Sequence, residues 1–466
     1  MHELRSYLQI LKDQDQVEHI SAEVDPQYEM AGVMALLEKD GRAFHFSNVK
    51  GAKFPAVGGF CNTLERLGAA LGFADVKPFT ADNFYQMLDG AKAGPIPPKE
   101  VATSPVKDVI KNGAAVDLSD LPVPSFFELD TGPFITAAVG ISRDPETGVQ
   151  NVGVYRTLIL DKHRIVINAS SLSDLRRIYR HWEATGEPMP VALAIGVPQA
   201  VLVAAASKLP PNQCEFDVAG ALMGAPLNLV RCENSDLLVP ASAEFILEAT
   251  VDFSDWVENQ LGEFAGQYGP GDSPISTVNT MTHRTDAMFY TILAGQNPEH
   301  NLIGSVAAYG IQRSIAKSLI DAIPQIKRCH VYLEPAFGTM THIIVSIDKT
   351  DDRVPRQIIE KAFSLEGAIF PVSMITKRIV VVDDDIDIAD RIDVEWAIWT
   401  RAADAAKFIT IPNVESWELE RAAKAGGKSV RIGIDATMDL EDVDKLVRPI
   451  IPGAADLRLE DYREKK

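Results

Sequence analysis

The side chains of the segment Asn151-Val-Gly-Val-Tyr-Arg156 alternate as in a β-strand. The segment indicates that the central part of the chain is built from strands. On a strand, Asn151, Gly153 and Tyr155 share one face, and Arg156 lies on the opposite face. Glycine weakens a strand unless another group approaches it closely, so Gly153 indicates a close contact. For Arg156, the segment alone favours the ordinary interpretation of a solvent-exposed strand arginine with its stem packed down.

Further short segments rich in Val, Ile, Thr and Tyr surround this one, and turns such as residues 143–148 separate them. This spacing predicts an antiparallel β domain, for which a barrel is one form. Its expected strands are residues 134–141, 151–160, 164–167, 191–195 and 227–231. Helices are predicted to interrupt it at residues 173–185 and 199–206.

The chain before the β domain mixes helical and strand patterns. Leu4, Leu8 and Leu11 recur at helical spacing, a strand-like segment covers residues 57–61, and a further helix is predicted directly after it, over residues 63–71. The proline-rich stretch that ends near residue 106 has no periodicity, which is typical of a linker or an extended crossing segment. We place the first domain boundary near residues 106–121.

From about residue 314 onward, helical patterns alternate with apolar strands such as residues 343–347 and 379–382. This alternation favours an α/β domain. We therefore predict an α/β (α+β multidomain) fold with three domains, over residues 1–115, 116–310 and 311–466.

Length and charge restrict the classes of function. The 466 residues are too many for one hydrophobic core. The 45 Lys and Arg residues stand against 65 Asp and Glu residues, and this net charge of −20 argues against nucleic acid or an anionic membrane as a partner. Any anionic ligand must therefore be held by a few local cations, a metal ion or a helix N-terminus.

The four cysteines are scattered and form no CxxC pair, which indicates buried thiols in a reducing compartment. The first residues lack the apolar core of a signal peptide, and no run approaches the roughly 20 apolar residues of a membrane span. We predict a cytoplasmic protein.

The segment Glu258-Asn-Gln-Leu-Gly-Glu263-Phe-Ala-Gly-Gln-Tyr-Gly-Pro-Gly carries two carboxylates among four glycines and a proline, and it is predicted to be a glycine-rich loop. Two acids in such a loop can converge on one point, and an arginine between them would drive their proton affinities apart. In a chain with 65 acids, two solvated glutamates on a flexible loop are the simpler alternative.

Two weaker patterns also carry charge. Glu215 follows Cys214 among apolar residues and suits either a strand edge or a hard-cation ligand. Thr376-Lys377-Arg378 precedes the apolar run 379–382, and Asp383-Asp-Asp-Ile-Asp387 follows it. Opposite charges at the two ends of a buried strand fit a strand-end site, and they equally fit plain solvation of both ends.

These four segments, in their order along the chain, resemble those of the UbiD family of reversible decarboxylases that use prenylated FMN. The resemblance runs over most of the chain, through segments that include Leu4-Arg-Ser-Tyr-Leu, Val239-Pro-Ala-Ser-Ala-Glu-Phe-Ile-Leu-Glu248, Val381-Val-Asp-Asp-Asp-Ile-Asp387, Val394-Glu-Trp-Ala-Ile-Trp-Thr-Arg401 and Gly433-Ile-Asp-Ala-Thr437. It implies an amino-terminal α/β domain, a central split β-barrel like that of flavin reductases, which holds the cofactor, and a carboxy-terminal α/β domain used for assembly. The assembly would be a homodimer or homohexamer.

The family's Glu-Arg-Glu network falls on Glu258, Arg156 and Glu263. The resemblance implies that Glu263 gives or takes the proton at the carbon that loses carbon dioxide, and that Arg156 binds the substrate carboxylate. Glu258 would complete the network. A guanidinium grips a carboxylate with two parallel hydrogen bonds, and a protonated acid can quench the carbanion equivalent. No side chain supplies the necessary electron sink, so the modified flavin would do so.

The resemblance also implies a cofactor site with Mn²⁺ and K⁺. Its residues are Asn151, Gly153, Val154, Tyr155, Arg156, Ser170, Ser171, Glu215 and Lys377. Lys377 would serve the cofactor phosphate, and the metal would be held by an Asn, a His and a Glu, of which the Asn and the Glu fall on Asn151 and Glu215.

The histidine ligand does not transfer, because Ser170 or Ser171 stands at its expected place, His163 lies too early and His181 lies within a predicted helix. Three alternatives follow: a metal with fewer protein ligands, a phosphate held without metal, or a different cofactor. The coexistence of Asn151 and Glu215 favours the first. Lys208 either compensates part of the missing charge or is a solvated loop lysine.

The predicted function is thus the reversible, non-oxidative decarboxylation of an unsaturated, aromatic or heteroaromatic carboxylic acid. The partners would be that acid, carbon dioxide and a flavin prenyltransferase that supplies the cofactor. Met223, Leu302, Ile303 and residues 335–340 are expected to shape the substrate pocket. The main alternative is a non-catalytic or cofactor-binding subunit of a multi-subunit carboxylase or decarboxylase complex. Hydride transfer by ordinary flavin is a third possibility, but the chain has no glycine fingerprint for a nicotinamide site.

Overall fold

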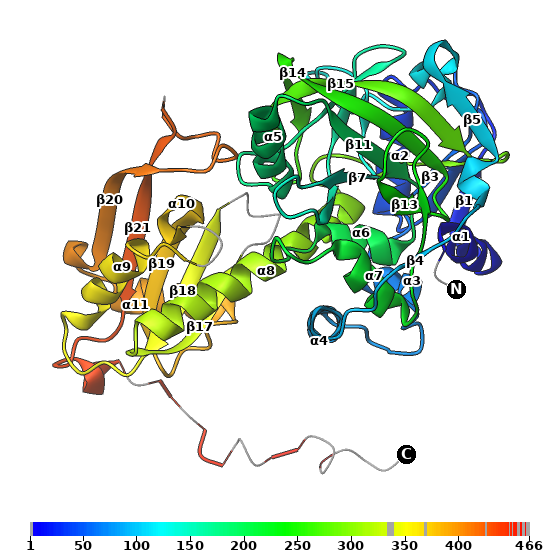
Figure 1. The fold of residues 1–466 in the computed structure, drawn as a ribbon. Helices are drawn as coiled ribbons and strands as arrows, with labels where there is room; N and C mark the ends of the chain where they lie inside the picture. The colour runs from blue at the N-terminus through cyan, green and yellow to red at the C-terminus, as the bar shows by residue number, and fades with distance from the viewer. Residues whose placement is uncertain are drawn as a thin grey trace. The chain divides into compact units, whose positions relative to one another are not determined.

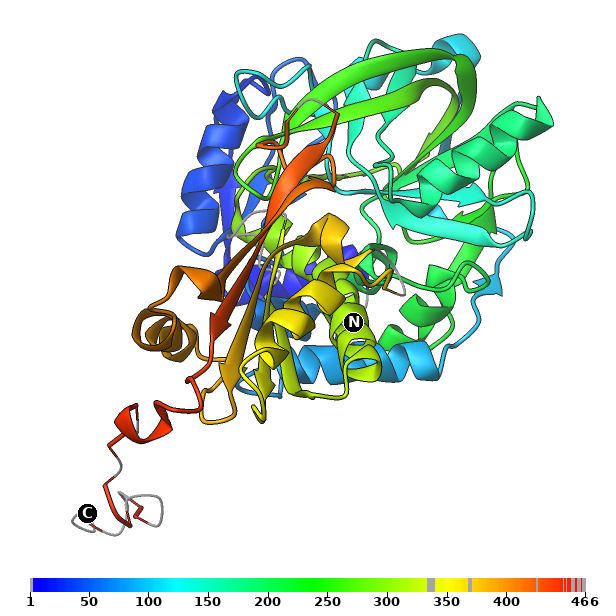
Figure 2. The same ribbon diagram turned by 90° about the vertical axis from the view of Figure 1, so that its left-hand side faces the viewer.

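The central part of the chain forms one nine-stranded antiparallel sheet, in the order β6-β9-β10-β15-β14-β11-β7-β8 with β5 beside β15 (Figure 1). The strands are β5 (Val109–Asn112), β6 (Phe134–Ile135), β7 (Ala138–Arg143), β8 (Gln150–Val154), β9 (Thr157–Ile159), β10 (Arg164–Ile167), β11 (Met189–Ile195), β14 (Phe245–Gly262) and β15 (Tyr268–His283). The computed structural model describes residues 3–332, 340–367, 371–424, 426–446, 448–449, 451–453, 457–458 and 462. Figure 2 shows the long β14–β15 pair, in green, as a curved ribbon.

The strand order requires the sheet to curl. β8 and β9 lie six places apart in the sheet, which would separate them by roughly 29 Å in a flat sheet. Only Tyr155 and Arg156 connect them, and three Cα steps span at most about 11 Å. The two ends of the sheet therefore approach each other at this connection, which produces the predicted half-open, barrel-like domain.

Two details of the strand prediction are wrong. Residues 151–160 are not one strand, because the chain leaves β8 after Val154 and enters β9 at the other end of the curled sheet. Residues 227–231 do not join this sheet. Their strand β12 (Asn228–Arg231) lies between β13 (Leu238–Pro240) and β4 (Lys99–Glu100) in a separate three-stranded sheet.

Contacts divide the chain into two units. The first comprises Met1–Ile311 with Trp417–Ala422, and the second comprises Gln312–Tyr332, Met340–Ser416 and Ala423–Lys466. The division falls within helix α8 (Pro298–Ala322). Besides the large sheet, the first unit contains a four-stranded sheet of β1 (Val17–Ile20), β2 (Ala43–Phe46), β3 (Ala56–Gly58) and β16 (Phe289–Tyr290). Its other helices are α1 (Leu4–Asp13), α2 (Glu29–Lys39), α3 (Leu64–Ala70), α4 (Ala81–Ala93), α5 (Asp174–Thr185), α6 (Gln199–Ala206) and α7 (Glu215–Met223).

Two buried glutamates meet inside the first unit. Glu299, at the start of α8, accepts hydrogen bonds from the backbone amides of Gly59 and Cys61 at 2.8 Å and from the Tyr290 hydroxyl at 2.9 Å. Glu38 of α2 accepts only a long bond from the Glu299 amide, at 3.4 Å, and its other carboxylate oxygen has no partner. Burial raises the pKa of both carboxyl groups, and for Glu38 the neighbouring Glu299 raises it further.

This pair predicts a pH dependence of stability. Because the folded-state pKa of Glu38 is raised, the folded chain binds more protons than the unfolded chain above the ordinary value near 4.5. The free energy of unfolding is therefore largest at low pH within this window and falls as pH rises. We expect Glu38→Gln to reduce that fall, as measured by urea unfolding at about pH 5.5 and about pH 8. Glu65→Gln, on the exposed face of α3, is the control. An unchanged pH dependence in Glu38→Gln would contradict the prediction.

The second unit is the expected α/β domain. Its sheet has the order β17-β18-β19-β21-β20, in which β18, β19 and β21 run parallel. The strands are β17 (Ile326–Tyr332), β18 (Thr341–Ile347), β19 (Thr376–Asp383), β20 (Phe408–Glu415) and β21 (Lys428–Ala436), and the helices are α9 (Val354–Phe363), α10 (Val372–Ile375) and α11 (Arg391–Arg401). The apolar run 379–382 is fully buried, as its composition predicts for a central parallel strand.

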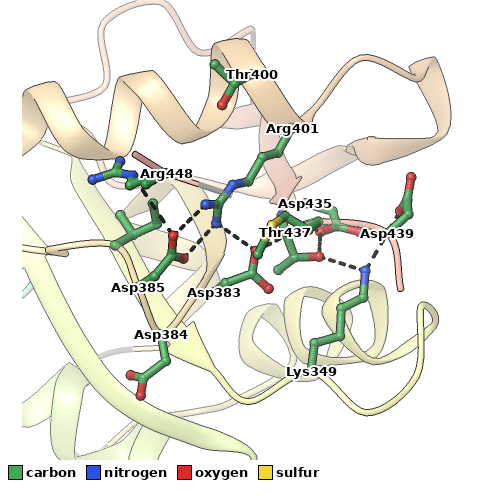
Figure 3. Close-up of polar contacts among 12 residues, drawn as sticks. Lys349, Asp383, Asp384, Asp385, Thr400, Arg401, Asp435, Thr437, Asp439 and Arg448 are labelled. Carbon is green, nitrogen blue, oxygen red and sulfur yellow. Dashed lines mark hydrogen bonds and ion pairs between the residues drawn. The ribbon is translucent and has the colours of Figure 1, made fainter. Parts of the chain in front are cut away.

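Two of the acids at the end of β19, Asp383 and Asp385, form ion pairs with the buried Arg401 (Figure 3). Arg401, with no exposed side-chain surface, donates to Asp383 at 2.8 Å and to both oxygens of Asp385 at 2.9 and 2.6 Å. Asp383 also accepts from the backbone amide of Met438 at 2.7 Å. These acids join α11 to the ends of β19 and β21, so neither a free strand-end site nor simple solvation describes them.

Within the described residues, no helix combines the length and the apolar character needed to cross a membrane.

Candidate active site

An arginine and a glutamate meet at the split of the large sheet. Arg156 lies in the two-residue connection between β8 and β9, and its Nη1 contacts Oε1 of Glu263. Its Nη2 donates to the carbonyl oxygens of Pro270 at 2.5 Å and Gly269 at 3.3 Å. The two side chains are only 15 % and 13 % exposed. Arg156 is therefore held from several directions, and the exposed strand arginine favoured by its segment alone is not observed.

Glu263 begins a hairpin turn, which corrects the predicted glycine-rich loop. β14 ends at Gly262, and the Glu263 amide continues the ladder by donating to the Gln267 carbonyl at 2.8 Å. Gly266 closes the turn with a positive φ of 74°. The glycines that disfavour a helix here lie in the β14–β15 strand pair and in its turn. Close packing around both strands leaves no room for side chains at several of these positions.

Three of these glycines are required by close contacts. A Cβ on Gly262 would lie 2.4 Å from the Phe127 ring, and one on Gly269 would lie 2.4 Å from Cγ of Glu263 and 3.1 Å from Nη1 of Arg156. On Gly271 it would lie 2.1 Å from Oδ1 of Asn168. Gly269 therefore allows the Arg156–Glu263 contact to form against the backbone of β15.

Glu258 does not reach this contact. It is exposed on β14, directly opposite Asp272 of β15. Side chains alternate along a strand, so the face of β14 that carries Glu258 is not the one that carries the buried Asn259. Among the described contacts, no hydrogen bond or ion pair joins Glu258 to Arg156 or Glu263. The structure thus brings together two of the three predicted catalytic residues.

Asn151 and Glu215, the two predicted metal ligands, line one small pocket of about 10 Å³, roughly the space of a water molecule. Glu215 is the first residue of α7, and its Oε2 accepts from the Val152 amide at 2.8 Å. Nδ2 of Asn151 donates to the Tyr155 hydroxyl at 3.1 Å, which leaves its Oδ1 available. The pairing of these two residues, 64 positions apart, was predictable only from the resemblance.

The pKa of Glu215 is raised to about 8, chiefly by burial and in part by nearby Asp174, against the lowering effect of two backbone hydrogen bonds and of Lys208. Its described hydrogen-bond donors are backbone amides. The pocket therefore holds a carboxyl group whose ionised form lacks a close cation. A bound metal ion would stabilise that ionised form.

The close contact predicted at Gly153 is confirmed, and the contacting group is the ring of Tyr155. A Cβ on Gly153 would lie 2.4 Å from that ring, and one on Gly140 of the neighbouring strand would lie 2.7 Å from it. Tyr155 is buried, which raises the pKa of its hydroxyl group. Gly153 therefore allows the Tyr155 ring to pack against β8. Val154, partly buried, ends β8.

The remaining predicted cofactor residues lie elsewhere. Ser170 and Ser171 are exposed in the turn before α5, and Ser171 donates from its amide to Glu418 at 3.0 Å and from its hydroxyl to the same carboxylate. Lys377 belongs to the second unit, where its Nζ donates to Ser429 at 3.0 Å. Residues 335–339 of the predicted substrate pocket lie outside the described residues.

Two residues near the arginine–glutamate pair were not identified from the sequence. His300 of α8 is close enough for Glu263 to raise its pKa and for Arg156 to lower it, although burial has the largest effect and lowers it. Asp130 accepts from the amides of Gly262 at 3.0 Å and Phe127 at 2.8 Å, which fixes the end of β14. Neither residue belongs to a local motif, because each reaches the site through the tertiary fold.

Comparison with known protein families covers most of the chain. Residues 99–297 match the UbiD model, described as the 3-octaprenyl-4-hydroxybenzoate carboxy-lyase Rift-related domain. Residues 304–436 and 8–81 match the C-terminal and N-terminal domains of the same carboxy-lyase. The chain belongs to the UbiD family of carboxy-lyases.

UbiD-class structures share the whole architecture. The UbiD-class enzyme HmfF from Pelotomaculum thermopropionicum, solved in complex with FMN, is 30 % identical, with a TM-score of 0.78 over 99 % of this chain and 100 % of its own. An evolved dimeric form of HmfF was solved with prFMN. Vanillic acid decarboxylase from Sedimentibacter hydroxybenzoicus is 24 % identical, with a TM-score of 0.81 over 99 % and 98 % of the two chains, and supports the fold. The Synechocystis protein sll0936 is 29 % identical over 459 residues, 93 % of this chain and 89 % of its own.

The residues of the Asn151–Glu215 pocket fit the divalent ion that the UbiD resemblance implies. Amide and carboxylate oxygens are the donors that Mn²⁺ accepts, and the buried Glu215 is short of positive charge. Tyr155 orients Asn151 so that Oδ1 remains free to bind. This donor set contains no imidazole.

Proposed function

We propose that this UbiD-family protein catalyses the reversible, non-oxidative decarboxylation of an unsaturated, aromatic or heteroaromatic carboxylic acid with prenylated FMN. The observation that supports it is the contact between Arg156 and Glu263 at the split of the sheet, held by the carbonyls of Gly269 and Pro270. The 30 % identity to HmfF, which binds FMN and in an evolved form prFMN, supports the cofactor.

Arg156 binds the substrate carboxylate. Its Nη2 is directed by the two carbonyls, and its Nη1 contacts Glu263, so the guanidinium has a defined plane in which to grip a second carboxylate. This grip places the scissile carbon–carbon bond beside Glu263 and reduces the entropy lost in the reaction step.

Glu263 delivers the proton. When carbon dioxide leaves, the electron pair of the broken bond remains on the substrate carbon, and protonated Glu263 gives its proton to that carbon. In the reverse direction the same carboxylate removes the proton. The prenylated flavin supplies the electron sink for this pair when bound. Glu258 is proposed to assist from the exposed face of β14, which requires it to approach once substrate is bound.

Cofactor binding is assigned to the strand that carries Asn151 and to its surroundings. Asn151 and Glu215 would hold Mn²⁺ at the cofactor phosphate, with K⁺ nearby. Gly153, Val154 and Tyr155 would form the wall beside the flavin, with Ser170 and Ser171 at its edge. The family resemblance also assigns Lys377 to the cofactor phosphate.

The experiment is production of the full chain with a flavin prenyltransferase, followed by an absorption spectrum and intact mass of the released ligand. The holoenzyme is then incubated in D₂O with a panel of aromatic and heteroaromatic carboxylic acids. Deuterium at the vacated carbon, detected by NMR, is the expected result. Absence of flavin would overturn the cofactor assignment. Bound prenylated FMN without turnover would favour the alternative, a cofactor-binding subunit of a larger complex.

Gly269 provides a structural test of the proposed site. Gly269→Ala places a methyl group within 2.4 Å of Glu263 Cγ, so either the carboxylate or β15 must move. A displacement of about 1 Å in a catalytic group can cost about 100-fold in rate, and we expect kcat to fall between about tenfold and 100-fold. Steady-state kinetics and the flavin spectrum of the holoenzyme measure this.

Gly90→Ala is the matched control for Gly269→Ala. Gly90 lies within α4, and a methyl group there meets nothing within 4 Å. A normal kcat in Gly269→Ala with bound flavin would contradict the close packing as a requirement for catalysis.

A further inference from the structure

The pocket that contains Asn151 and Glu215 has a third oxygen donor. Asp174 lines the same pocket and is the first residue of α5, as Glu215 is the first residue of α7. The three donors therefore come from three elements, β8, α5 and α7, and the fold brings them to one place. Asp174 was not identified from the sequence, because the serines before it were considered instead.

The other charged groups of this pocket are already satisfied. Asp144 accepts a hydrogen bond from Arg177 and lies 2.9 Å from Nδ1 of His181. Arg177 is therefore committed to Asp144, and only its Nη2 approaches Asp174, at 3.7 Å. His181 does not line this pocket; its Nδ1 lies 2.9 Å from Asp144 and its Nε2 lies 3.6 Å from Glu146.

Asp174 is poorly satisfied by comparison. Its nearest cations are Nη2 of Arg177 at 3.7 Å and Nζ of Lys208 at 3.6 Å, and both lie beyond hydrogen-bond distance. No described donor lies within 3.5 Å of its carboxylate. Asp174 and Glu215 thus both lie near Lys208, and among the described residues neither carboxylate accepts a hydrogen bond from a cationic side chain.

We propose that Asp174 is a ligand of a divalent cation, together with Asn151 and Glu215, and that Lys208 is the counter-ion of Asp174 when the metal is absent. The assignment rests on the proposed function, since it concerns the metal of the proposed cofactor site. Two carboxylates and one amide form an all-oxygen donor set, which suits Mn²⁺ or Mg²⁺ and makes an imidazole ligand unnecessary.

The test is Mn²⁺ binding to the full chain, measured by the EPR signal of free Mn²⁺ with and without saturating FMN. We expect Asp174→Asn and Glu215→Gln each to raise the Kd by at least about tenfold. Lys208→Met is expected to lower the Kd, because the ion no longer competes with the ammonium group. Asp217→Asn is the matched control, since Asp217 lies in the first turn of α7 and outside the pocket.

The outcomes separate this inference from the proposed function, because Mn²⁺ binding is measured without any turnover of substrate. If Asp174 served only an ion pair with Lys208, then Asp174→Asn and Lys208→Met would both leave the Kd unchanged and lower the Tm alike, and the proposal would be overturned. A wild-type chain that binds no Mn²⁺ would overturn it as well. Asp174-dependent binding in a chain without decarboxylase activity would leave the ligand assignment intact and contradict only the function.

Discussion

Glu263→Gln is expected to lower the rate of decarboxylation by about 100-fold to 10,000-fold while flavin stays bound, because a positioned general acid contributes about this much. The amide preserves the shape of the side chain and can still contact Arg156, but it has no proton to deliver to the substrate carbon. Single-turnover kinetics of the holoenzyme, together with deuterium incorporation into the product, measures the effect.

Two variants on the same hairpin make this result interpretable. Asp272→Asn changes an exposed acid beside the turn and is expected to leave the rate unchanged. Glu258→Gln lies directly opposite it and tests whether the third predicted member of the network acts at all. A Glu263→Gln enzyme with normal deuterium incorporation would show that the proton comes from another group and would remove Glu263 from the proposed mechanism.

Arg401→Met is expected to destabilise the second unit by about 3 kcal/mol. The guanidinium is wholly buried and donates three hydrogen bonds to Asp383 and Asp385. Its removal leaves the mostly buried Asp383 with its negative charge and, among the described residues, only the Met438 amide as a donor. Calorimetry of the full chain measures the loss as a lower unfolding temperature of the second unit.

Arg353→Met is the control for this change. Arg353 pairs with Asp351 at the surface with 81 % of its side chain exposed, and such pairs contribute about 0–1 kcal/mol. An Arg401→Met variant as stable as Arg353→Met would show that the acids after β19 do not depend on the buried arginine.

Much of the architecture was predictable from local patterns. Alternation over residues 164–167 and 191–195 predicts strands β10 and β11, and helical spacing predicts α1, α5 and α6. The order of the motifs was sufficient for the family resemblance, which the domain matches confirm. These features succeed because hydrophobic periodicity is a local consequence of burying one face of a strand or helix.

The sequence also predicted which residues meet at the site, in part. Arg156 and Glu263 were paired through motifs 107 positions apart, and the structure joins them. Glu258 was grouped with them by the family's motif and because two acids five positions apart in a loop can converge. The predicted loop proved to be a strand hairpin, on which an odd separation places side chains on opposite faces.

The sequence by itself determined the alternating strands, the acidic charge and the motifs that carry the arginine and the glutamate. Only the tertiary structure decided that residues 151–160 break at Tyr155, that Gly269 must lack a side chain, and that Asp174 shares a pocket with Asn151 and Glu215. The physical reason is that the sheet curls until strands six places apart are joined by two residues. This closure places side chains from distant segments in contact, and no local sequence pattern predicts which of them will meet.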